Sequence, residues 1–257
     1  MNINWQRSLL KQCLAVSLFT GYIVTFRVSA SVALITSDST LGTRVIQQSP
    51  SFERIEGGAV RGTSLFHSFQ EFYVGKGRTV EFAPLNGIEN FFSRVTGDNA
   101  SNIEVTLGVL GNATLFLLNP NGILFGPNAD LDILGSFVAS TANSLLFKDG
   151  VEFSATNPQG LPILKINLPI GLQFGSNPDG IEMQNDDLLD KKPGVTRALL
   201  GGNVTLDGSD LEVRGGRVDL GGLAETGTVN LVSKDGNFSF NFPVGVKRSD
   251  VLLRNGS

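Results

Sequence analysis

The second half of this 257-residue sequence is organised as apolar pairs, in which two apolar residues flank a single other residue. Five such pairs follow Gly201, with first members 7, 7, 11 and 9 residues apart: Val204/Leu206, Leu211/Val213, Val218/Leu220, Val229/Leu231 and Phe238/Phe240. Turn dipeptides such as Asp207-Gly208 and Gly215-Gly216 fill the intervals. Because residues two apart lie on the same face of a β-strand, the pattern predicts short strands joined by tight turns.

Two all-β architectures are compatible with this pattern. In a solenoid, each coil of roughly 20 residues carries two or three short strands that stack on the next coil, and each inward pair buries one rung of the core. A β-sandwich also has turn signals at intervals of about 8–12 residues. The short spacing of the pairs favours the solenoid, with the sandwich as the alternative.

The residues before Gly201 add to the β character, and the composition of the whole chain excludes several classes of function. Period-two runs recur at 103–107 and 113–118, and no sustained helical periodicity follows residue 33. The formal net charge of −4 provides no basic face for a nucleic-acid backbone. One cysteine and one histidine exclude a disulfide framework and the usual zinc sites, so we expect no metal and no cofactor.

The N-terminus has the organisation of a secretory signal peptide. Arg7 and Lys11 precede an uncharged apolar stretch, 12–26, and small residues ending at Ala33 follow. The alternative, a membrane anchor, would need roughly 20 apolar residues, more than this stretch offers. We therefore expect residues 1–33 to be removed after export by the Sec machinery. Cleavage would remove three basic residues and the only cysteine, Cys13, which changes the net charge from −4 to −7.

Residues 119–123 read Asn119-Pro120-Asn121-Gly122-Ile123, with strand-like runs on both sides. Asparagine at the first position, proline at the second and glycine at the fourth favour a type I turn. The segment is therefore expected to form a sharp corner between two core strands, which by itself is a structural feature and not evidence of function.

Several motifs in a fixed order carry a family resemblance. They are Leu65 to Phe72 (LFHSFQEF), Ser93 to Gly97 (SRVTG), Asn119 to Ile123 (NPNGI), Gly135 to Asn143 (GSFVASTAN), Gly202 to Gly208 (GNVTLDG) and Gly215 to Leu220 (GGRVDL). Together they resemble the secretion domain of two-partner-secretion exoproteins, also called the filamentous haemagglutinin N-terminal or haemagglutination-activity domain. The resemblance extends from residue 34 to about residue 240.

The resemblance implies an all-β fold, namely a right-handed parallel β-helix with an N-terminal cap and extra-helical strands. It implies that residues 34–257 form a secretion domain with the first β-helix coils. In such a system of Gram-negative bacteria, the unfolded exoprotein crosses the periplasm and meets an outer-membrane β-barrel transporter, whose POTRA domains recognise it. The product is secreted or held at the cell surface. Residues Asn119, Pro120, Asn121, Gly122 and Ile123 are implied to be a motif for folding and secretion.

Many members of the family carry a second, upstream Asn-Pro-Asn-Leu motif, and the nearest stretch here is Asn86-Gly87-Ile88-Glu89-Asn90. Since the coils of a solenoid stack on their neighbours one at a time, folding can begin at the exported N-terminal end and propagate. We state this coil-by-coil order as a hypothesis for how folding outside the cell opposes return of the chain.

Two alternatives from other functional classes remain open. Parallel β-helices also include polysaccharide-active enzymes, which need converging carboxylates; Asp130 and Asp132 share one strand face, a pattern that a solvated face also produces. We assign no catalytic residue. The second alternative is an adhesin that binds glycans of a host or cell surface, although in the family such activity usually belongs to long downstream repeats. His67 lies in an aromatic stretch and is expected to be a packed structural histidine.

Overall fold

The computed structural model describes residues 34–257 except 160–167, 185–187, 190–191 and 235. The predicted signal peptide, 1–33, lies outside the described residues. The described part consists of β-strands, turns and one short 3-10 turn, η1 (Lys148–Gly150). Within this described part, no helix has the length and apolar character needed to cross a membrane.

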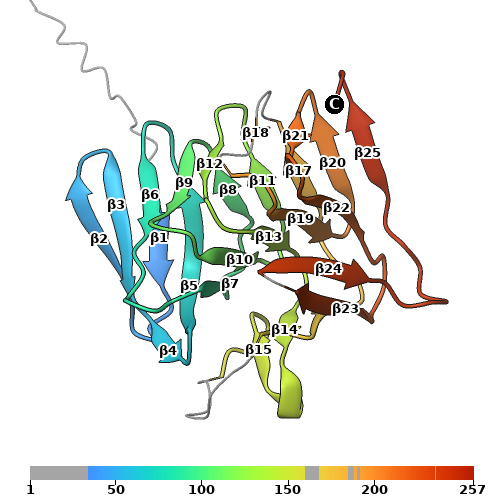
Figure 1. Ribbon diagram of the computed structural model, residues 1–257, viewed down its shortest axis with the longest axis horizontal. Helices are drawn as coiled ribbons and strands as arrows, with labels where there is room; N and C mark the ends of the chain where they lie inside the picture. The colour runs from blue at the N-terminus through green and yellow to red at the C-terminus, as the bar shows by residue number, and fades with distance from the viewer. Residues whose placement is uncertain (1–33, 160–167, 185–187, 190–191, 235) are drawn as a thin grey trace, which may run out of the picture. The chain divides into compact units, whose positions relative to one another are not determined.

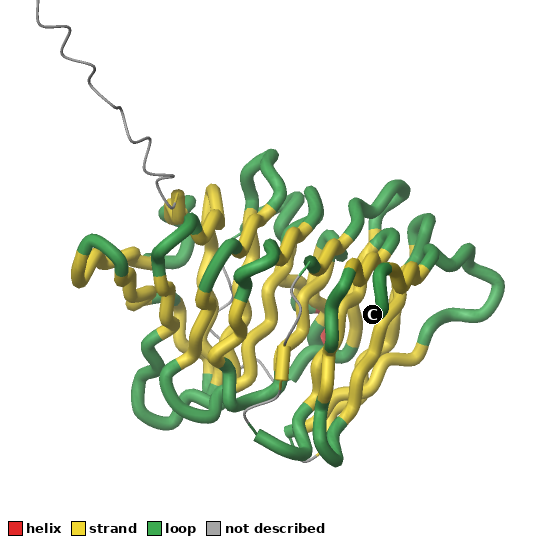
Figure 2. The backbone as a smooth tube through the Cα atoms, turned by 90° about the horizontal axis from the view of Figure 1, so that it is seen from above, coloured by secondary structure: helices red, strands yellow, loops and turns green. Residues whose placement is uncertain are grey.

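Successive strands wind into coils that stack along the molecule (Figures 1 and 2). Their strands are β5 (Ser64–Val74), β6 (Thr79–Phe82), β7 (Asn90–Val95), β8 (Ser101–Ile103), β9 (Thr106–Val109), β10 (Thr114–Leu118), β11 (Ile123–Phe125), β12 (Asp130–Asp132), β13 (Phe137–Ser140), β17 (Ile181–Met183), β18 (Leu188–Leu189), β19 (Thr196–Gly201), β20 (Val204–Asp207), β21 (Leu211–Glu212), β22 (Arg217–Gly222) and β25 (Val251–Arg254). Each pairs in parallel with the corresponding strand of an adjacent coil, as β7 does with β10 and β8 with β11.

The coils present three faces. The first face contains the beginning of β5, then β7, β10, β13, β19 and β22, and the second face contains the end of β5, then β8, β11, β17, β20 and β25. Because the long strand β5 belongs to both, these two faces form one continuous sheet. The third face contains β6, β9 and β12, and it is extended at its N-terminal end by β3 (Phe52–Gly57).

Strands from the N-terminal end of the described chain cover the first coil. β1 (Leu34–Ser37) and β4 (Ala59–Arg61) pair antiparallel with β5, and β2 (Thr43–Ser49) pairs antiparallel with β3. These strands form the expected N-terminal cap, because they close the first rung with antiparallel neighbours instead of a further coil.

A separate antiparallel sheet lies outside the coils. It has the order β15-β14-β16-β23-β24, with β14 (Ser144–Leu146), β15 (Glu152–Ser154), β16 (Gly171–Phe174), β23 (Gly227–Lys234) and β24 (Asn237–Asn241). Its first three strands are inserted after β13 and its last two after β22. We call it the covering sheet.

Two hydrophobic cores result from this arrangement. One fills the inside of the coils, with Phe91, Leu115 and Phe137 in adjacent rungs. The other lies between the outside of the first face and the covering sheet, and contains Phe92, Phe116 and Val138. First-face strands are therefore buried on both sides, and every residue of β7 is buried. This explains why these strands read as nearly continuous apolar runs instead of alternating ones.

The prediction of an all-β parallel β-helix with an N-terminal cap and extra-helical strands is confirmed. The parallel pairing of β7, β10 and β13 excludes the sandwich. One detail of the sequence analysis is wrong: the pairs Val229/Leu231 and Phe238/Phe240 are not solenoid rungs, because they lie in β23 and β24 of the covering sheet, which pair antiparallel. A period of two marks a strand with one buried face and does not identify its partner.

Candidate functional site at the Asn119–Ile123 corner

The Asn119–Ile123 segment joins β10 to β11, where the chain turns from the first face to the second. The backbone N–H of Gly122 donates to the carbonyl of Asn119 at 3.2 Å, which closes the predicted turn. The side-chain oxygen of Asn119 accepts the N–H of Asn121 at 3.0 Å, an Asx-type bond. Gly122 has a φ of +104°, a conformation that residues with a side chain rarely adopt.

The side chains of the corner hold adjacent coils together. The amide of Asn119 donates to the carbonyl of Asn99 at 3.0 Å and to the hydroxyl of Ser101 at 2.9 Å. The amide of Asn121 donates to the carbonyl of Gly97 at 2.7 Å. All three acceptors lie in the corner of the preceding coil, so the two asparagines clamp one coil to the next.

Backbone hydrogen bonds connect the same corner to the coil that follows. The N–H of Asn119 donates to the carbonyl of Ser140 at 3.0 Å, and the N–H of Ile123 donates to the carbonyl of Gly180 at 3.2 Å. Asn119 is fully buried, and Ile123 is 2% exposed inside the coils. Only Pro120 and Asn121 are partly accessible, so most of the motif serves the fold.

A shallow groove of about 320 Å³ lies beside this corner on the second face. Asn121, Leu124, Asp179, Glu182 and Thr205 are among the residues that line it. The groove borders the accessible part of the motif and carries two carboxylates.

A buried arginine near this corner has a role that the sequence analysis did not identify. Arg94 of β7 is fully buried on the outside of the first face. Its guanidinium donates to Ser68 Oγ at 2.8 Å, the Ser154 carbonyl at 2.9 Å, Thr40 Oγ1 at 3.2 Å and the Gln159 carbonyl at 3.3 Å. These partners come from β5, the N-terminal cap and the β15 region, so a single side chain connects three parts of the molecule.

Asp38 provides the negative charge of this network. Its carboxylate accepts the N–H and hydroxyl of Thr40, at 2.9 and 2.8 Å, and the hydroxyl of Thr96 at 3.1 Å. It also accepts the hydroxyl of Ser68, which therefore bridges Asp38 and Arg94. Burial alone would raise the pKa of Asp38, but the hydrogen bonds from Ser68, Thr40 and Thr96 outweigh it and hold the pKa below its ordinary value.

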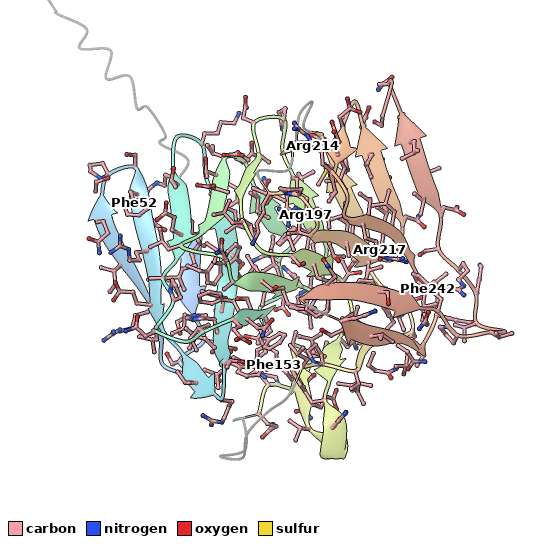
Figure 3. All side chains as sticks on the ribbon, viewed as in Figure 1. Phe52, Phe153, Arg197, Arg214, Arg217 and Phe242 are labelled. Atoms are coloured by element: carbon pink, nitrogen blue, oxygen red, sulfur yellow. The ribbon has the colours of Figure 1, made fainter. Side chains whose placement is uncertain are left out.

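The Arg94 guanidinium also lies over the ring of Phe153, 4.6 Å from its centroid; Figure 3 labels Phe153. Burial lowers the pKa of Arg94 to about 10, while the charge of Asp38 acts in the opposite direction. Arg94 therefore stays charged at neutral pH. Asp38 compensates its charge, and its hydrogen bonds are complete only when the cap and the β15 region are both in place.

His67 is a packed structural histidine, as the sequence predicted. It is fully buried inside the first coil, with its ring 5.5 Å from that of Phe82 and 5.9 Å from that of Phe91. Its Nδ1 is 3.3 Å from Thr43 Oγ1, and its Nε2 has no hydrogen-bond partner among the described residues. Burial lowers the pKa of His67 from 6.5 to about 3.

This pKa predicts a loss of stability in weak acid. Between pH 6.5 and about 3 the unfolded chain protonates His67 and the folded chain does not, so stability falls as the pH falls. Moving from pH 6.5 to pH 5 should cost about 2 kcal/mol. Urea unfolding at the two pH values measures this cost, and His67→Leu should remove it. An unchanged pH slope in the variant would contradict the assignment.

The carboxylates of β12 and β22 lie on strand surfaces. Asp130 and Asp132 lie on the outside of β12, on either side of the buried Leu131, as expected. Asp219 lies in β22 and pairs with Arg217, with Oδ1 2.7 Å from Nη2. Among the residues that the structure describes, no group of three or more His, Cys, Asp or Glu side chains could hold a metal ion.

Comparisons with known proteins give consistent results. The family model described as "TPS secretion domain" matches residues 33–257. A stretch of 75 residues, 29% of this chain, is 33% identical to the heme/hemopexin-binding protein of Haemophilus influenzae and covers 8% of that protein. This chain therefore spans only a small part of that relative's length.

Two solved structures are similar at low sequence identity. The HMW1 secretion domain from Haemophilus influenzae is 17% identical with a TM-score of 0.48, and the similarity covers 87% of this chain and 51% of that one. The filamentous hemagglutinin secretion domain is 13% identical with a TM-score of 0.42, covering 88% and 97%. The family model matches every residue that the structure describes, and the chain therefore belongs to the TPS secretion domain family.

Proposed function

We propose that this chain directs the export of a secreted Gram-negative exoprotein through a partner outer-membrane transporter of the two-partner type. The observation that carries this proposal is the match of the secretion-domain family over residues 33–257, which include all the coils, the cap and the covering sheet. In this proposal residues 1–33 are a Sec signal peptide, and the transporter's POTRA domains bind the chain in the periplasm before it folds.

The Asn119–Ile123 motif acts in this function through folding. Its amides clamp adjacent coils, and three of its five residues are buried in the folded chain. Asn119, Gly122 and Ile123 are buried and cannot contact a transporter after folding, so a direct contact through these three residues must be made by the extended chain. Loss of the motif would therefore lower secretion by weakening the folded product outside the cell.

Binding to POTRA domains tests the proposal. The periplasmic POTRA domains of a two-partner transporter from the same genome are immobilised, and the chain is added while it is diluted out of urea. We expect binding of the refolding chain and weaker binding of the chain that has already folded. The POTRA domains of a general outer-membrane assembly factor serve as the control. Equal binding to both sets of domains, or no binding to either, would contradict the proposal.

The polysaccharide-active enzyme and the glycan-binding adhesin stay predictions from the sequence. Each has its own assay, cleavage of a sugar polymer or retention on immobilised glycans, and neither assay depends on the transporter.

A further inference from the structure

The outside of the first face carries a row of apolar side chains that runs across successive coils. Phe66, Phe92, Phe116 and Val138 occupy equivalent positions in β5, β7, β10 and β13, and each is fully buried. The rings of Phe66 and Phe92 are 5.0 Å apart, as are those of Phe92 and Phe116. We call these four residues the outer row.

The aromatic side chains that cover the phenylalanines of the outer row come from later in the chain. The ring of Phe153, the central residue of β15, lies 5.1 Å from that of Phe66, and the ring of Phe147 lies 5.5 Å from that of Phe92. Phe116 is covered by Phe238 of β24, with the two rings edge to face at 5.1 Å. Since β16 pairs with β23, the two inserted segments complete one sheet over the row.

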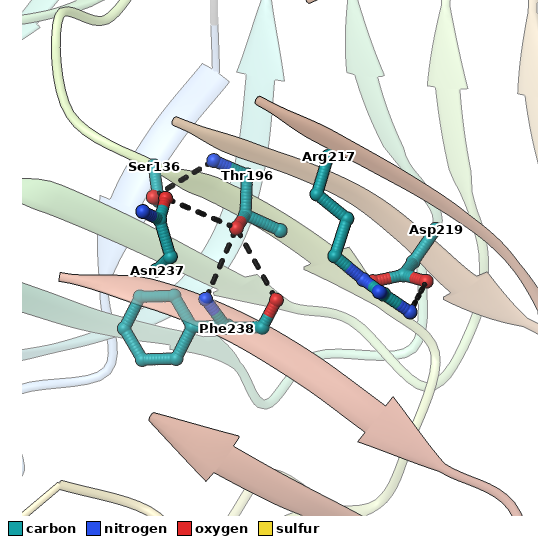
Figure 4. A network of polar contacts seen from close by, with 6 residues as sticks. All are labelled: Ser136, Thr196, Arg217, Asp219, Asn237 and Phe238. Atoms are coloured by element: carbon teal, nitrogen blue, oxygen red, sulfur yellow. Dashed lines mark hydrogen bonds and ion pairs between the residues drawn. The ribbon is translucent and has the colours of Figure 1, made fainter. Parts of the chain in front are cut away.

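Polar contacts fix β24 to the coils at the same place (Figure 4). The hydroxyl of Thr196 in β19 accepts the N–H of Phe238 at 3.0 Å and lies 3.2 Å from its carbonyl. The hydroxyl of Ser136, just before β13, donates to the carbonyl of Gly236 at 3.0 Å and accepts the N–H of Thr196 at 3.1 Å. These contacts connect β24 to the two coils that contain β13 and β19.

Arg94 has the same dependence on later residues. Two of its four acceptors, the carbonyls of Ser154 and Gln159, belong to the segment inserted after β13. Until that segment docks, Arg94 and the aromatic row would be exposed to water, and the contacts of Arg94 with the Ser154 and Gln159 carbonyls would be unmade. Burial of the row and completion of these hydrogen bonds therefore stabilise the second coil only after docking of the segment, which pairs with β23 through β16.

We infer that β23 and β24 are the closing element of the domain, and that the first coils hold their folded structure only after these strands have docked. This order differs from coil-by-coil folding, in which each coil becomes stable once the next has stacked. A second consequence of this docking order rests on the proposed export function. The chain stays extended until about residue 241 has crossed the outer membrane. Folding therefore opposes return of the chain only from that point.

Native-state hydrogen exchange of the folded chain tests this order without any transporter. Phe238→Ala removes the ring that covers Phe116. We expect amides of β7 and β10 to exchange at least about 100-fold faster than in the unsubstituted chain, together with those of β23 and β24. Leu253→Ala, at a 58% exposed position in β25, is the control and should leave β7 and β10 nearly unchanged.

The milder variant Thr196→Val keeps the shape of the side chain and removes its contacts with Phe238, and should accelerate the same amides by about 5- to 30-fold. If Phe238→Ala does not fold, the exchange of β7 and β10 amides in Thr196→Val tests the inference instead. Faster exchange confined to β23 and β24, with β7 and β10 unchanged, would overturn the inference. Because no transporter is present, this result is independent of whether the export proposal is right.

Discussion

Replacing Arg94 with methionine is expected to lower the free energy of unfolding by about 3–5 kcal/mol. Methionine matches the arginine side chain as far as Nε and carries no charge, so it leaves the Ser154 and Gln159 carbonyls without their donor. It also leaves the partly buried Asp38 without the positive charge that lies beyond the Ser68 hydroxyl. Arg94→Lys keeps the charge but cannot reach four acceptors in different directions, and should recover only part of the loss.

Urea unfolding at pH 7 measures these changes, and Arg217→Met is the matched control. Arg217 forms its ion pair with Asp219 at the surface, where its side chain is 51% exposed. An exposed pair of this kind contributes about 0–1 kcal/mol. If Arg94→Met and Arg217→Met cost the same, the Arg94 network does not hold the cap, the second coil and the β15 region together.

Replacing Asn119 with aspartate is expected to cost about 2–4 kcal/mol. The change keeps the oxygen that accepts the N–H of Asn121, so the turn itself can still form. It replaces the amide that donates to the Asn99 carbonyl and the Ser101 hydroxyl with a second oxygen, and it places a charge in a fully buried position. The variant thus separates the clamp between coils from the shape of the turn.

Asn121→Asp, in the same turn, is the matched control. Asn121 is partly accessible, and its amide makes one bond between coils, to the Gly97 carbonyl. Its replacement should cost about 1 kcal/mol. Thermal or urea unfolding compares the two variants, and the amount of each variant released from cells shows whether export follows stability. Equal losses of stability would mean that the Asn119 clamp is not the main contribution of the motif.

Local features of the fold could be predicted from the sequence, because local residues determine them. The Asn119–Ile123 corner is an example: asparagine, proline and glycine specify a turn wherever they occur in this order. The clamp formed by Asn119 could not be predicted, because its acceptors lie in a different coil. The period-two pairs predict strands correctly, but they do not distinguish the coils from the covering sheet, to which Phe238 and Phe240 belong.

The role of Arg94 depends on residues far away in the chain, so its neighbours in sequence did not reveal it. Its partners Thr40 and Gln159 lie on either side, 54 and 65 residues away. One signal is present in the sequence. Arg94 interrupts the run Phe91-Phe92-Ser93-Arg94-Val95, and the remaining four residues all suit a buried strand. A charged residue in such a run indicates a buried network, since isolated charges are not buried.

Export with and without the transporter is the most direct test of the proposed function. The chain is produced in a Gram-negative host with its partner transporter, without it, or with a transporter that lacks its POTRA domains, and the amount of folded chain in the medium is measured. We expect release into the medium only with the complete transporter, and retention in the periplasm in the other two cases. Equal release in all three, or retention despite the complete transporter, would contradict the assignment of this chain as an export-directing domain.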